Sequence, residues 1–172
     1  MPNVLLAQLG RPPPGTGTAV NTPLDAPRAA YLLTAAMADN TQQAGAIVPG
    51  DDMSTEWGGY DESAQHDILD ALGEQTRVAL KMLHDKLGVE IEMDWDSTAR
   101  VVCSEALAAA RELVKPEPGA WALPECAHCR EVIAKAMCSL QIQAYFRLGF
   151  PPAKIAAMCR QSADEPQASP RP

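Results

Sequence analysis

The residues best suited to chemistry are two cysteines, Cys126 and Cys129, which form a C-x-x-C spacing with Ala-His between them. Pro124 stands just before them and favours the first turn of a helix, so the sequence predicts both thiols near a helix N-terminus. The dipole and the free N–H groups at such an end stabilise a thiolate on the first cysteine. The spacing therefore indicates a candidate redox pair.

The letters C-A-H-C at 126–129 resemble the CxHC redox element of thiol oxidoreductases. The resemblance implies a thioredoxin fold, in which this element follows a buried strand and is surrounded by βαβ units. The sequence around it predicts helices instead, and the resemblance covers only four residues, so we carry no activity over. No Ser/His/Asp or Cys/His pair elsewhere has the context of a catalytic site. We therefore expect a protein that is not an enzyme.

Zinc is the alternative for the same cysteines, because structural zinc sites use the C-x2-C spacing. A strong zinc signature has a second C-x2-C or H-x3-H pair, and this sequence has none. We predict that the cysteines are small buried apolar side chains and that the chain binds no cofactor. In the zinc alternative, Cys126 and Cys129 are two of the four ligands, and Cys103, His128, Cys138 or Cys159 would complete the site.

The amino-acid composition changes near residue 60, and the predicted helices that carry these cysteines follow this change. Residues 1–60 are rich in Pro, Gly, Thr, Ala and Asn, whereas residues 61–163 follow the periodicity of amphipathic helices. We divide the 172 residues into an extended N-terminal arm (1–60), a helical body (61–163) and a flexible tail (164–172).

The N-terminal arm combines extended and helical features. Residues 11–23 hold four prolines and two glycines, which excludes a helix or a central strand there. Residues 26–39 predict one short helix. The letters W-G-G-Y at 57–60 either latch the arm onto the body, which we favour, or anchor it to a partner. The arm residues that we expect to meet a partner are Leu5, Leu6, Leu9, Tyr31, Trp57 and Tyr60.

The helical body should be a small, mainly α bundle of three to four helices with at most a minor β element. Periodicity and stop signals predict helices over residues 62–87, 97–115, 124–148 and 152–162. Gly73 lies inside the first of them and should weaken that helix by about 1 kcal/mol relative to alanine.

One segment of the body does not fit a helix. Residues 89–95 read V-E-I-E-M-D-W, which alternates apolar and acidic side chains as a strand with one buried face does. A single strand needs a partner, which can be residues 3–9, residues 46–48 or another chain. We therefore add the apolar side chains Ile91, Met93 and Trp95 to the expected partner-binding residues.

The net charge of −8 makes nucleic acid an unfavourable partner, because an acidic body repels phosphate groups. Most of this charge lies in residues 61–115, where six basic residues face twelve acidic ones. Five cysteines, an odd number, argue against a disulfide framework. We also expect neither a signal peptide nor a transmembrane helix, so the cytoplasm is the expected location.

These observations favour a structural or assembly subunit that docks into a larger complex through its N-terminal arm. The expected partners are protein subunits, including copies of the chain itself, and the concrete form that we predict is a connector, cement or minor capsid component of a virus particle. The alternative is a small acidic regulatory protein. Such a protein would either mimic nucleic acid or bind DNA through a helix-turn-helix-like segment at 141–163.

Overall fold

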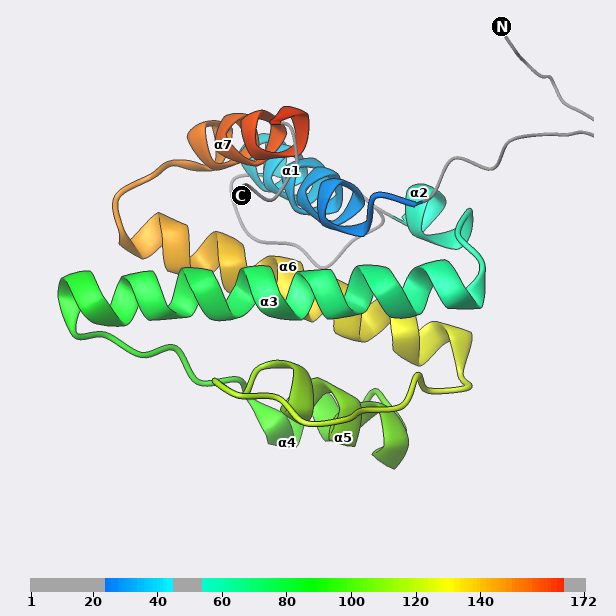
Figure 1. Ribbon diagram of the computed structural model, residues 1–172. Coiled ribbons are helices and arrows are strands. Elements are labelled where there is room, and N and C mark those ends of the chain that lie inside the picture. Colours follow the sequence, from blue (N-terminus) through cyan, green and yellow to red (C-terminus); the bar gives the residue numbers. More distant parts are fainter. Residues whose placement is uncertain (1–23, 45–53, 166–172) are drawn as a thin grey trace, which may run out of the picture.

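The computed structural model describes residues 24–44 and 54–165 (Figure 1). Within these ranges the chain forms seven helices and no strand. The mainly α prediction is therefore confirmed, whereas the predicted number of helices was too small. The helices are α1 (Ala26–Ala44), α2 (Ser54–Gly58), α3 (Glu62–Leu87), α4 (Trp95–Ala99), α5 (Ser104–Leu113), α6 (Ala127–Arg147) and α7 (Pro152–Asp164).

The helices stack in three layers, which Figure 1 shows from the side. α1 packs along α7 in the first layer, α3 packs on α6 in the middle layer, and α4 and α5 form the third. Because α3 and α6 contact both α1 and α5, they hold the centre of the molecule. The four longest helices thus form the bundle, and three short helices close its sides.

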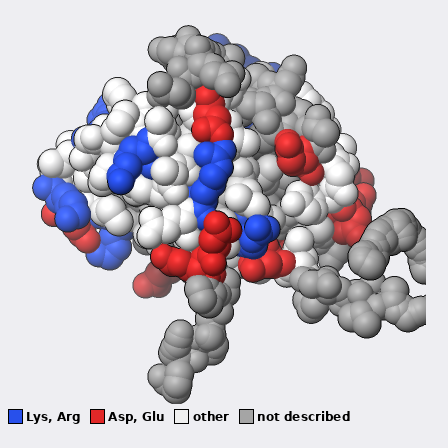
Figure 2. Space-filling view, turned by 90° about the horizontal axis from the view of Figure 1, so that it is seen from above, with Lys and Arg blue, Asp and Glu red and all other residues white. Residues whose placement is uncertain are grey.

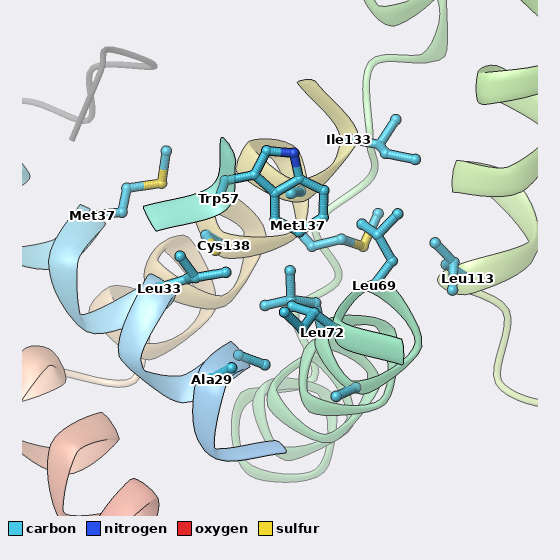
Figure 3. Close-up of a cluster of buried hydrophobic side chains, with 14 of the residues drawn as sticks. Ala29, Leu33, Met37, Trp57, Leu69, Leu72, Leu113, Ile133, Met137 and Cys138 are labelled. Carbon is cyan, nitrogen blue, oxygen red and sulfur yellow. The ribbon is translucent and has the colours of Figure 1, made fainter. Parts of the chain in front are cut away.

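The core lies where α1, α3, α5 and α6 meet, and Figure 3 shows its side chains. Leu33 and Met37 reach it from α1, Leu69 and Leu72 from α3. Apart from one tryptophan the fully buried large side chains are aliphatic or methionine, as the aromatic-poor composition requires. Such a core gains its stability from many small apolar contacts.

α3 follows the sequence closely because its signals are local. The Asp61 carboxylate accepts a hydrogen bond from the Ala64 N–H at 2.8 Å and caps the first turn. Gly88 has a φ of 66°, and its N–H closes the last turn on the His84 carbonyl at 2.8 Å. The predicted span of 62–87 is confirmed at both ends.

The helix predicted over 97–115 is broken into α4 and α5. Asp94 starts α4 early, because its carboxylate accepts hydrogen bonds from the N–H and the hydroxyl of Ser97. α4 ends at Ala99, ahead of the β-branched Val101 and Val102, and Cys103 takes an extended conformation as the N-cap of α5. The prediction of one continuous helix was wrong at this point.

The described part of the N-terminal arm belongs to the packed body. α1 is five residues longer than predicted and buries one face between α7, α3 and α6. The composition change near residue 60 is therefore not an edge of the packed core. Residues 1–23 and 45–53 lie outside the described residues, as do 166–172 of the predicted tail.

Gly73 permits the close approach of α5 to α3, which changes the expected effect of its substitution. A Cβ at this position would lie 3.0 Å from both the carbonyl oxygen and the Cδ2 atom of Leu113. The Gly73→Ala variant gains about 1 kcal/mol of helix propensity but forces these helices apart. We expect a net loss of about 1 kcal/mol in a urea unfolding titration, and a more stable variant would show that this contact is loose.

Candidate functional site

The predicted thiol pair lies at the start of α6, beside a third cysteine. Cys126 is the N-cap of this helix, and its Sγ atom accepts the Cys129 N–H at 3.3 Å. The N–H of Cys103 donates to the Sγ atom of Cys129 at 3.3 Å. The fold thus joins Cys103, Cys126 and Cys129, which we name the thiol cluster.

The environments of Cys126 and Cys129 differ sharply. Cys126 is exposed, and hydrogen bonds from the side chain and the backbone N–H of Cys129 hold its pKa below the usual value. Cys129 is 4% exposed, and burial raises the pKa of its thiol to about 11. The cluster therefore pairs an accessible nucleophilic sulfur with a protonated buried one.

Of the remaining candidate metal ligands, Cys138 and Cys159 lie away from the thiol cluster. His128 is exposed on the first turn of α6. Cys138 is buried in the core, where its Sγ atom accepts the Thr34 hydroxyl at 3.4 Å. Cys159 is buried on α7, and burial raises the pKa of its thiol to about 11. In the described part of the chain, no group of three or more His, Cys, Asp or Glu side chains is arranged to hold a metal ion.

A cavity of about 700 Å³ opens beside the thiol cluster, between α5 and the segment that leads to α6. We name it the α5 cavity. It gives solvent and small molecules a path to the exposed thiol. Its walls include Cys103 and Cys126, three carboxylates (Glu105, Glu112 and Glu125) and the apolar residues Trp121 and Leu123.

A buried arginine holds the segment that carries Cys126. The guanidinium of Arg130 is 6% exposed and donates to the carbonyls of Pro124 and Glu125 at 2.7 and 3.0 Å. It also donates to Gln65 Oε1 at 2.7 Å, and the Gln65 amide donates to the Trp57 carbonyl at 3.1 Å. Because Gln65 lies 65 positions before Arg130 in the sequence, the pattern of neighbouring residues does not predict this network.

The aromatic partner-binding candidates of the arm mostly serve the chain itself. Trp57 is 2% exposed in the main core (Figure 3), and Tyr60, which the figure does not label, is partly buried against the same cluster. This burial agrees with the latch interpretation of 57–60, and partner binding by Trp57 and Tyr60 stays a prediction. Tyr31 is half-buried against the core. Leu5, Leu6 and Leu9 lie outside the described residues.

The predicted strand at 89–95 is not formed, and residues 89–94 belong to no helix or strand. Val89, Ile91 and Met93 are half-buried against the bundle, and Glu90 and Glu92 are exposed, so the predicted alternation of side chains is present. Residues 89–93 make no backbone–backbone hydrogen bond to other described residues. Trp95 begins α4 instead of continuing the segment. We name residues 88–95 the acidic edge.

A second cavity, of about 240 Å³, lies directly beside the acidic edge. We name it the edge cavity. The Arg111 guanidinium lies 5.3 Å from the centroid of the Trp95 ring and holds this ring at the rim. The cavity is apolar apart from one carboxylate, and its walls are Leu80, Ile91, Glu92, Met93, Trp95, Val114 and Leu140.

The face formed by α1 and α7, on the other side of the bundle from α4 and α5 (Figure 1), carries both basic and acidic side chains. Figure 2 views it from above and shows basic and acidic side chains interspersed. Two ion pairs join these helices, Arg28 with Asp164 and Arg160 with Asp39. Of the two basic residues of α7, Lys154 is exposed and Arg160 is held in one of these ion pairs.

No protein-family model, curated protein or solved structure matches this chain. Among the described helices, none is both long and apolar enough to cross a membrane.

Proposed function

We propose that the chain is a non-enzymatic assembly subunit that binds an extended basic segment of a partner protein along its acidic edge. The observation that supports this most is the backbone of residues 89–93. It lies outside any helix and makes no main-chain hydrogen bond within the described chain, while its apolar side chains fix it to the bundle. Such an edge can add a partner strand through main-chain hydrogen bonds.

The negative charge of the acidic edge favours a basic partner segment. Residues 88–96 carry four acidic side chains and no basic one, and Glu90 and Glu92 are exposed. Two such edges repel each other, because like charges directly opposite destabilise a strand pair. A segment with Lys or Arg at alternate positions gains both complementary charge and faster association.

The edge cavity adds a second element of specificity. Strand addition obtains affinity from the main chain and selectivity from pockets that accept alternate side chains. The rim at Trp95 and the wall at Val114 and Leu140 are apolar, so one large aliphatic side chain of the partner fits there. The proposed partner segment is therefore extended, basic and centred on an aliphatic residue.

The more specific predictions from the sequence remain predictions. Docking through residues 1–23, pairing between copies of the chain, and a place in a virus particle do not follow from the described helices. A deletion that removes residues 1–60 would also remove α1 and Trp57 from the core. The deletion that tests the arm without disturbing the core therefore ends at residue 23.

The test is a charge reversal at the acidic edge. The probe is a labelled nine-residue peptide of alternating Lys and Thr with a central Leu, and fluorescence anisotropy measures its affinity for the full chain. Glu90→Lys with Glu92→Lys should weaken binding at least tenfold, because each reversal turns attraction into repulsion. The matched control is Glu74→Lys with Glu117→Lys, which changes the net charge equally at exposed positions and should bind like the wild type.

Two outcomes would contradict the proposal. Equal binding of a peptide with Glu in place of Lys would remove the charge argument. The acidic mimic remains the alternative, and Val114→Phe separates it from strand docking, because this change fills the edge cavity without altering charge. Docking predicts weaker peptide binding by Val114→Phe, whereas unchanged binding by this variant would favour the mimic.

A further inference from the structure

We propose that Cys126 and Cys129 are a redox modification site, which forms a reversible disulfide by exchange with a low-molecular-weight disulfide of the glutathione type. This inference is independent of the acidic edge, and it concerns modification of the chain and not catalysis. It rests on three features of the thiol cluster, which are accessibility, sulfur contact and a third cysteine.

Accessibility assigns the two sulfurs different roles. Cys126 is exposed, caps α6 and opens on the α5 cavity, so an external disulfide can reach it. Its sulfur accepts the Cys129 N–H at 3.3 Å, which stabilises the thiolate. Cys129 is 4% exposed, so its sulfur cannot reach an external disulfide. Cys126 is thus the attacking sulfur and Cys129 the resolving one.

Contact between the sulfurs permits the second step. The Cys129 N–H lies 3.3 Å from the Cys126 sulfur, so the two cysteines are adjacent in the first turn of α6. The resolving attack is intramolecular and needs only a side-chain rotation. A mixed disulfide at Cys126 should therefore be short-lived.

The exchange balances in two steps. The Cys126 thiolate attacks one sulfur of glutathione disulfide, forms a mixed disulfide and releases one glutathione thiolate, which takes up a proton. The Cys129 thiol then gives up its proton, its sulfur attacks the Cys126 sulfur, and the second glutathione leaves as a thiolate that takes up this proton. Two protein thiols are oxidised to one disulfide, and one glutathione disulfide is reduced to two glutathione molecules.

The third cysteine connects the modification to the fold. The Cys103 N–H donates to the Cys129 sulfur at 3.3 Å, and Cys103 is the N-cap of α5. Turning the Cys129 sulfur toward Cys126 weakens this hydrogen bond between the two helix starts. We therefore expect faster amide hydrogen exchange in the first turn of α5 after oxidation.

The experiment treats the reduced full chain with glutathione disulfide, blocks the remaining thiols by alkylation and maps the products by mass spectrometry. The expected product has lost two hydrogens, links Cys126 to Cys129 and retains no glutathione. Cys129→Ala keeps an apolar side chain in the core and should accumulate one glutathione at Cys126. Cys103→Ala is the matched control and should form the same disulfide as the wild type.

Three results in the wild type would overturn the proposal. They are a stable glutathione adduct at Cys126, a bond between Cys103 and Cys129, and full alkylation of all thiols after the treatment. Circular dichroism checks the fold of each variant. If Cys129→Ala does not fold, the wild-type map still decides, because it identifies the linked pair directly.

Discussion

Replacement of Trp57 by alanine should lower the free energy of unfolding by about 4 kcal/mol, the largest loss that we expect from a single change. The ring is 2% exposed and belongs to the buried core cluster that also contains Met37 and Met137 (Figure 3). Removing it leaves a cavity that small aliphatic neighbours fill only in part. Chemical denaturation followed by far-ultraviolet circular dichroism measures the loss.

Trp121→Ala is the control for this change. Trp121 is half-buried, stacks on His66 with ring centroids 4.4 Å apart, and donates its Nε1–H to Asp70 at 3.1 Å. We expect a loss of about 1 kcal/mol, because the ring is not enclosed by the core. If Trp57→Ala lowered the free energy of unfolding no more than Trp121→Ala does, the latch interpretation would be wrong. Trp57 would then be a candidate for binding a partner.

Replacement of Arg130 by methionine should lower the free energy of unfolding by about 3 kcal/mol. Methionine fills a similar volume, but the Pro124 and Glu125 carbonyls and the Gln65 amide oxygen lose their donor. Buried acceptors without a donor carry a desolvation cost. Thermal and urea unfolding both measure this loss.

Arg130→Lys should recover little of the lost stability, because one ammonium group cannot reach three acceptors that the planar guanidinium serves at once. The exposed Arg147→Met is the control, with an expected change below about 0.5 kcal/mol. Recovery by lysine would show that charge matters here and not the hydrogen-bond geometry. It would also weaken the claim that this network positions the segment with Cys126.

The parts of the fold that the sequence predicted well are those with local causes. α3 has its cap, its apolar stripe and its terminal glycine within its own span, so both ends could be read from the chain. The alternation of residues 89–95 likewise predicted which side chains face the bundle. The predicted spans of α6 and α7 differ from the observed ones by at most three residues.

The features that the sequence did not predict depend on contacts between distant residues. Nothing within residues 26–44 shows that α7 will cover their apolar face, so α1 was placed in the arm instead of the core. Arg130 and Gln65 meet across 65 positions of the chain, and Cys103 and Cys129 across 26. A pattern of neighbouring residues identifies the C-x-x-C pair, but it cannot show which third cysteine joins it.

The central claim is that residues 89–93 form a docking edge, and amide hydrogen exchange tests it most directly. Without a partner these amides should exchange fast, because they have no main-chain acceptor in the described chain. With the Lys-Thr peptide bound, alternate amides of this segment should exchange at least tenfold more slowly, while those of α1 and α7 stay unchanged. Peptide binding with no added protection at 89–93 would contradict the account.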